Sequence, residues 1–181
     1  DIIKALEEDF SSRGEVICEI RVNGVVLEEV DEDRFKTNPS EAINDLAIST
    51  NQPSRLINDA IRSALAFIPE IELAAVSTAE DLRGTNVTGS RQAFVEILDG
   101  CQWLIDTIMH VRGAASGIGQ PILNPEKWFE AEKLVGRVIG ELTDAFTKSD
   151  IVLVADLLEY ELPPSLSLWA DALKEEQARR A

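Results

Sequence analysis

The sequence predicts a mostly helical α+β fold, in which a small N-terminal β-hairpin module precedes an antiparallel bundle of about four helices. Two observations predict it. The dipeptide Asn23-Gly24 separates two short runs rich in valine and isoleucine, a pattern typical of a tight β-hairpin. From about residue 53 onward, apolar residues recur at helical spacing in long stretches separated by short polar or proline-containing breaks. We therefore predict two domains, residues 1–50 and residues 51–181.

The N-terminal module is expected to contain a short helix and a hairpin. Residues 2–10 place their apolar residues on one helical face, and Gly14 is a plausible end of this helix. Residues 15–30 then form the hairpin, because Asn-Gly readily adopts the positive φ angles of a type I′ turn. Residues 43–48 are a candidate third strand, and the polar residues 31–41 are a candidate connector between the domains.

The first bundle helix is expected to begin near Pro53 and to end before Gly84. Pro69 lies inside this stretch, and we predict a kink or break there because proline removes a backbone donor and crowds the preceding turn. The second helix is predicted over about residues 90–110. The Gly-, Ala- and Ser-rich residues 113–119 that follow are predicted to form a loop.

The third helix is expected to start at the Asn-Pro pair of residues 124–125 and to last until the polar residues 148–150. In the fourth helix, the Pro-Pro pair at residues 163–164 predicts a kink or a fresh start, since proline in a helix interior costs about 3 kcal/mol. Residues 175–181 are polar and are expected to fray. Long amphipathic helices joined by short connections bury their apolar stripes most simply as an up-and-down bundle.

The composition limits the classes of partner. The chain has 33 acidic and 17 basic residues, so its formal net charge is −16. Such a surface repels phosphate groups within a Debye length of about 8 Å, so we predict no nucleic-acid partner. No apolar run approaches the ~20 residues that span a bilayer, which predicts no membrane insertion. Cys18 and Cys101 both lie in apolar patterns and are predicted to be buried free thiols, and with no signal-peptide pattern we predict a cytoplasmic location.

Residues that could carry catalysis are few. The single histidine, His110, has Asp106 one helical turn before it, and Asp99 lies two turns further back. An Asp/His pair at this spacing can hold a metal ion, but di-metal bundles need Glu-x-x-His motifs, and this sequence has none. We therefore predict no catalytic residues, no metal and no cofactor, and keep a metal-dependent enzyme that uses Asp99, Asp106 and His110 as an alternative.

A second acidic group surrounds Tyr160. Asp156 and Glu159 are three residues apart and share a helical face, whereas Glu161 points elsewhere. Paired carboxylates can carry out acid/base chemistry or bind a cation. The simpler interpretation is a solvated helix face.

Three tryptophans, Trp103, Trp128 and Trp169, lie one on each of the last three long helices. Trp128 and Trp169 fit the apolar stripes of their helices, and Trp103 lies at the edge of its stripe. Core packing explains them most simply. As a functional alternative, all three and Tyr160 are candidate anchors for a partner protein, because aromatic side chains dominate many interfaces.

Part of the chain resembles a known family. Residues 142–150, the Leu-Leu pair at 157–158 and Trp169 resemble the end of the flagellin export chaperones, small bacterial four-helix bundles without an N-terminal hairpin. Residues 155–163 also resemble a motif of uncharacterised bacterial proteins with a hairpin followed by helices. The resemblance covers roughly residues 53–175. It implies a groove between helices that binds an amphipathic segment of a secreted partner.

The leading hypothesis is a non-catalytic bacterial cytoplasmic protein, an adaptor or chaperone-like bundle that binds another protein through an amphipathic helix. This hypothesis rests on two observations: the sequence contains many amphipathic helices, and its reactive side chains do not converge. The metal-dependent enzyme is one alternative. A purely structural homodimer is another, in which an uncovered edge of the small sheet pairs between chains.

Overall fold

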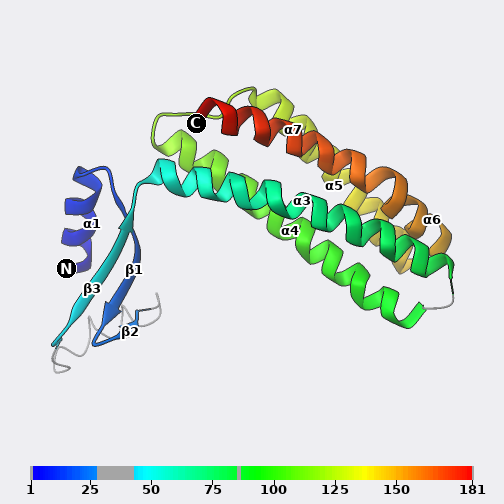
Figure 1. The fold of residues 1–181 in the computed structure, drawn as a ribbon, viewed down its shortest axis with the longest axis horizontal. Coiled ribbons are helices and arrows are strands. Elements are labelled where there is room, and N and C mark those ends of the chain that lie inside the picture. Colours follow the sequence, from blue (N-terminus) through cyan, green and yellow to red (C-terminus); the bar gives the residue numbers. More distant parts are fainter. Residues whose placement is uncertain (1, 28–42, 85–86, 181) are drawn as a thin grey trace. The chain divides into compact units, whose positions relative to one another are not determined.

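The computed structural model describes residues 2–27, 43–84 and 87–180 (Figure 1). The chain forms two compact units, Asp1–Leu56 and Ile57–Ala181. The predicted connector over residues 31–41 lies outside the described residues. Each unit is described by itself below.

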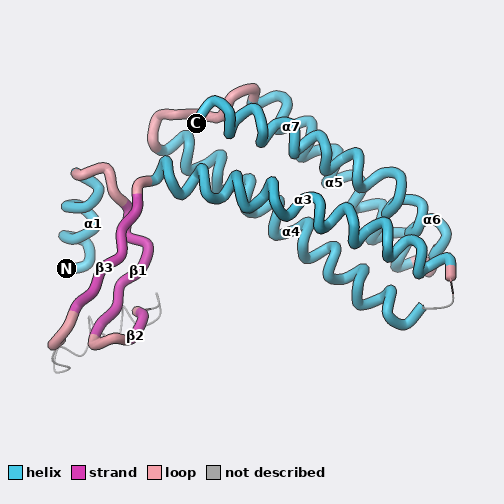
Figure 2. Tube along the Cα trace, viewed as in Figure 1, coloured by secondary structure: helices cyan, strands magenta, loops and turns pink. Residues whose placement is uncertain are grey.

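The first unit consists of helix α1 (Ile2–Ser12) and a three-stranded antiparallel sheet, shown in magenta in Figure 2. Strands β1 (Val16–Val22), β2 (Val25–Val26) and β3 (Leu46–Asn51) are arranged in the order β2-β1-β3. The hairpin between β1 and β2 is confirmed, and a third strand is present.

The hairpin turn has the backbone geometry that the sequence predicts. Asn23 and Gly24 have φ angles of 52° and 82°, as a type I′ turn requires. Val22 pairs with Val25, and the backbone N–H of Leu27 donates to the carbonyl oxygen of Ile20 at 2.8 Å. The two-residue turn therefore sets the register of the pair.

The sheet unit has a thin core. Among its described residues, Val22 is the one hydrophobic side chain that is buried. The pairing of β1 with β3 shifts by one residue between Ile17 and Glu19, so Cys18 is an extra residue on β1. The thiol of Cys18 is exposed and free, so the prediction that it is buried was wrong.

The second unit is a helical bundle. Helices α3 (Pro53–Arg83), α4 (Val87–Gly117) and α5 (Pro125–Thr147) run in alternating directions (Figure 1). The fourth rod is continuous and consists of α6 (Ile151–Asp156), the short π-helix η1 (Leu157–Glu161) and α7 (Leu162–Arg180). The mostly helical α+β fold and the bundle of about four helices are thus confirmed.

Apolar stripes from all four rods meet in one core. Each helix buries residues at alternating spacings of three and four, such as Phe94, Ile97, Cys101 and Leu104 of α4. Burial raises the pKa of the Cys101 thiol to about 12, which keeps it protonated and unreactive.

Helix α3 is continuous where a kink or break was predicted at Pro69, and helix α4 is longer than predicted. Helix α3 continues through Pro69, because Ile68 and Ile71 on either side of it are buried in the core and packing outweighs the missing donor. Helix α4 continues to Gly117, so the loop predicted over residues 113–119 was placed too early. Ala115 within that segment is buried, which extends the packed face of α4.

The Pro-Pro pair is accommodated by a wider helical turn. The backbone N–H of Leu162 donates to the carbonyl oxygen of Leu157, five residues earlier, as in a π-helix. A regular α-helix would place the ring of Pro163 against the carbonyl of Glu159. The predicted irregularity therefore exists, but as the π-helix η1, which ends at Glu161, two residues before the first proline. Helix α7 continues from it without a gap.

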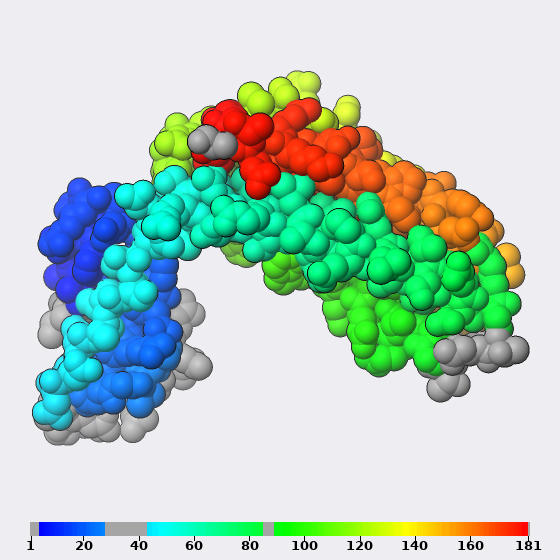
Figure 3. All heavy atoms as spheres, viewed as in Figure 1, coloured from blue at the N-terminus to red at the C-terminus, as the bar shows by residue number. Residues whose placement is uncertain are grey.

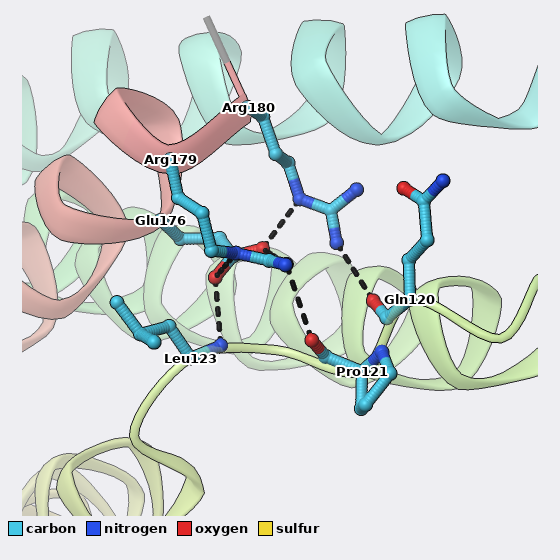
Figure 4. Close-up of polar contacts among 6 residues, drawn as sticks. All are labelled: Gln120, Pro121, Leu123, Glu176, Arg179 and Arg180. Carbon is cyan, nitrogen blue, oxygen red and sulfur yellow. Dashed lines mark hydrogen bonds and ion pairs between the residues drawn. The ribbon is translucent and has the colours of Figure 1, made fainter.

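The end of α7 is fastened to the α4–α5 connection (Figure 4). The carboxylate of Glu176 is buried and pairs with the guanidinium groups of Arg179 and Arg180. It also accepts a hydrogen bond from the backbone N–H of Leu123 at 2.8 Å. Arg179 also donates to the carbonyl oxygen of Pro121, and Arg180 donates to that of Gln120. Helix α7 is therefore ordered to Arg180, and the prediction that residues 175–181 fray was wrong for the described part.

Within the residues that the structure describes, no helix is both long enough and apolar enough to cross a membrane.

A candidate protein-interaction face on α3 and α4

The structure separates the three tryptophans. The side chains of Trp128 and Trp169 are 2% and 0% exposed, so these two predicted anchors belong to the bundle core instead. Trp103 is 44% exposed and lies on the outer side of α4. A partner could therefore contact Trp103 without any rearrangement of the bundle.

Trp103 packs against an aromatic residue of the neighbouring helix. Its ring lies 5.1 Å from the ring of Phe67 on α3, at an interplanar angle of 83°, an edge-to-face contact. Gly100, one turn before Trp103, makes room for this contact, because a Cβ atom there would lie 3.3 Å from Cζ of Phe67. The two rings thus bridge the boundary between α3 and α4, which lie side by side in Figure 3.

A shallow depression adjoins the two rings. It has a volume of about 450 Å³ and is lined by Ser63, Ala66, Phe67, Glu70 and Trp103. Its lining is mostly apolar, and Glu70 contributes a carboxylate to it. An open depression of this kind suits the side chains of a docked segment better than an enclosed small molecule.

Acidic side chains lie on both sides of Trp103 along α4. Glu96 and Asp99 lie seven and four residues before it, and Asp106 lies three residues after it, so all three share its side of the helix. All three are exposed. With Phe67, Glu70 and Trp103 they make up what we call the α3–α4 face, which has an aromatic centre and an acidic surround.

The residues of the predicted metal alternative also lie on this side of α4. Asp99 and Asp106 are seven residues apart, which is about 10 Å along a helix. The carboxylate of Asp106 accepts from Nε2 of Gln102 at 2.9 Å, and Nδ1 of His110 lies 2.7 Å from the backbone oxygen of Asp106. Among the described residues, no three His, Cys, Asp or Glu side chains gather as metal ligands would.

The acidic group around Tyr160 is held by an arginine from α3. Arg83 donates to Asp156 at 2.8 Å and to Glu159, and its guanidinium lies 5.8 Å from the centre of the Tyr160 ring. The hydrogen bond from Arg83 lowers the pKa of Glu159, and the hydrogen bond with Glu159 raises the pKa of Tyr160. Glu161 points elsewhere, as predicted, and pairs with Arg137 at 3.4 Å.

This arrangement fastens η1 to the end of α3. The carboxylates of Asp156 and Glu159 are already engaged by Arg83, so the group has the character of an ion pair between helices. Tyr160 remains 61% exposed and is a second exposed aromatic from the predicted set. The α3–α4 face has a depression next to its aromatic residues.

Sequence reasoning selected Trp103 but missed its partners. Phe67 directly precedes the buried Ile68, and Trp103 directly precedes the buried Leu104, so each aromatic residue lies beside the apolar stripe of its helix. The sequence therefore indicates that both aromatic residues lie at the edge of the core. It does not indicate which turn of α3 packs against which turn of α4.

Fold and site together define a helical-bundle protein with a small sheet unit and an exposed aromatic face surrounded by carboxylates. The chain belongs to the family described as Domain of unknown function (DUF8042), whose model matches residues 59–172 and hence most of the bundle. Searches of curated proteins and of solved structures return no match.

Proposed function

We propose that this protein is a non-catalytic adaptor or chaperone-like bundle that binds an amphipathic helix of another protein on the α3–α4 face. The observation that carries the proposal is the half-exposed Trp103, packed on Phe67 beside an apolar depression. Tryptophan is one of the side chains enriched among residues that dominate binding energy. The resemblance to export chaperones, which stays a prediction, favours the same kind of partner and a bacterial cytoplasmic setting.

The charge of the face determines which helix would fit. Carboxylates of Glu70, Asp99 and Asp106 surround an uncharged centre. A complementary segment has an apolar stripe at helical spacing and lysine or arginine residues next to it. An acidic amphipathic helix would meet like charges around the same depression. The proposed partner is therefore a basic amphipathic helix.

A designed peptide pair tests this proposal. One peptide is an amphipathic helix with leucines on one face and lysines on the other, and its control carries glutamates in place of the lysines. We expect calorimetry to detect binding of the lysine peptide only. Binding of both peptides, or of neither, would contradict the proposal.

Trp103→Ala is expected to weaken binding of the lysine peptide by at least about tenfold, because it removes the central aromatic contact. Phe129→Ala is the matched control, since Phe129 is 61% exposed on α5 and does not line the depression. We expect the affinity of this control to equal that of the wild type. If the two variants lose the same affinity, the peptide is held by the overall negative charge and the assigned face is wrong.

A further inference from the structure

The outer edge of the small sheet has backbone groups that pair with no described strand, and the register gives their positions. The N–H of Asn23 donates to the carbonyl oxygen of Asp45 at 2.8 Å, so residue 45 directs its backbone toward β1. Hydrogen-bonded pairs alternate along an antiparallel ladder. Ala47 and Ser49, which face Arg21 and Glu19, therefore also point toward β1. Residues 46, 48 and 50 point the other way, where no strand of the described chain pairs with them.

Strand β3 itself carries none of three features that normally prevent strand pairing at an edge. Natural edge strands are protected by charged side chains, proline or short length. Strand β3 has six residues, Leu-Ala-Ile-Ser-Thr-Asn, with no charge and no proline. The opposite edge strand, β2, has two residues. In a chain with a net charge of −16, an uncharged edge of this length is a surface that two copies can share without direct charge repulsion.

We propose that two copies of this protein associate through β3, pairing antiparallel around a two-fold axis at Ile48. In such a pair the outward backbone groups of Ile48 bond those of Ile48 in the second copy, and Leu46 bonds Thr50. Ala47 lies opposite Ser49, and no charged side chain meets another. The two sheets become one six-stranded sheet, which strengthens a unit whose own core is a single buried valine among the described residues.

A second copy fits this edge better than an unrelated strand does. The outward backbone groups of residues 46, 48 and 50, which no described strand pairs, are symmetric about Ile48. A second copy rotated by 180° can therefore pair with all of them. The apolar side chain of Leu46 is exposed in the single chain and gains a β-branched neighbour, Thr50, in the pair. This interface belongs to the sheet unit and does not depend on the α3–α4 face.

Two charge variants of the full chain test the interface by light scattering over a range of protein concentrations. Ala47→Lys with Ser49→Lys places lysines opposite each other across the two-fold axis. Ala47→Glu with Ser49→Lys places opposite charges there and also complements Arg21 and Glu19 within the chain. Residues 47 and 49 are exposed, so both variants should keep the fold, which circular dichroism checks.

We expect the wild type and the Glu/Lys variant to dimerise. The Lys/Lys variant should dimerise at least about tenfold more weakly, since like charges directly opposite each other destabilise strand pairs. Added salt should strengthen dimerisation of the wild type by screening the net negative charge of each chain. A monomeric wild type at all concentrations, or a dimer that responds equally to both variants, would overturn the proposal.

Amide hydrogen exchange adds an independent readout. In the wild type, exchange at residues 46, 48 and 50 should slow as the protein concentration rises, because these amides become bonded in the pair. Residues 47 and 49 should be protected at every concentration, because their amides bond β1. A concentration effect confined to the helical unit would place the dimer contact elsewhere and overturn the proposal.

Discussion

Replacing Glu176 by alanine is expected to lower the free energy of unfolding by about 3–5 kcal/mol, the range found when one partner of a buried ion pair is removed. Glu176 is fully buried and binds the backbone N–H of Leu123 together with Arg179 and Arg180. The side chain of Arg180 is itself 5% exposed. Without Glu176, this guanidinium would stay buried with its charge uncompensated, which is the physical reason for the large loss.

The neighbouring residue provides a matched control. Glu175 is half-exposed and pairs with Lys127 at 2.6 Å on the surface of the bundle. Surface ion pairs contribute about 0–1 kcal/mol, so Glu175→Ala should have a small effect. Urea unfolding followed by the helical signal at 222 nm measures both variants. Equal losses for the two would show that the contacts in Figure 4 do not fasten α7 to the α4–α5 connection.

The same carboxylate predicts how stability depends on pH. Burial acts to raise the pKa of Glu176, but hydrogen bonds from Arg179, from the N–H of Leu123 and from Arg180 outweigh it, so the pKa is lowered. A group with a lowered pKa in the folded state stabilises the protein above its unfolded pKa of about 4.3 and loses that contribution as the pH falls through the folded value. Glu176→Gln should therefore lose less stability than the wild type on acidification below about pH 4.

The elements that the sequence predicts correctly depend on local rules. Asn23-Gly24 between two apolar runs strongly favours a type I′ turn, and the hairpin follows. The apolar stripes of the bundle follow from helical spacing, which needs no knowledge of neighbours. A kink or break at Pro69 and a loop over residues 113–119 were predicted because local propensity opposes a helix at both places. Helix α3 is nevertheless continuous and α4 runs on to Gly117, because core packing outweighs that propensity. Which residues pack against a helix depends on the whole fold. Local rules therefore underestimate the length and continuity of helices such as α3 and α4.

The candidate site illustrates the same limit. The sequence identifies Trp103 as lying at the edge of its stripe, and the structure confirms that it is partly exposed. Its contact with Phe67 depends on the axial offset between two helices, which the spacing of residues within either helix does not contain. Glu176 was missed for a related reason. In the sequence it is one more charged residue in a polar tail, and its burial follows only from where residues 120–123 return to meet α7.

Trp169→Ala is expected to cost about 3–5 kcal/mol, as large-to-small changes of buried aromatic residues do. Trp169 is one of the largest fully buried side chains of the bundle and lies on the core face of α7 with Leu166 and Leu173. The bundle core consists of stripes from four rods, so a cavity in one rod removes contacts for its neighbours as well. Urea unfolding followed at 222 nm measures the loss independently of tryptophan fluorescence.

A second substitution at Trp169 separates the contribution of its ring volume from that of its indole N–H. No residue of the described chain accepts a hydrogen bond from Nε1 of Trp169, although this atom is buried. Trp169→Phe therefore removes part of the ring volume and a donor without a protein acceptor, and we expect a loss of only about 1–2 kcal/mol. A phenylalanine variant as unstable as the alanine variant would show that the indole N–H contributes a hydrogen bond to stability. A small loss would show that Trp169 serves the bundle through its volume alone, in contrast to Trp103, whose replacement is expected to change binding far more than folding.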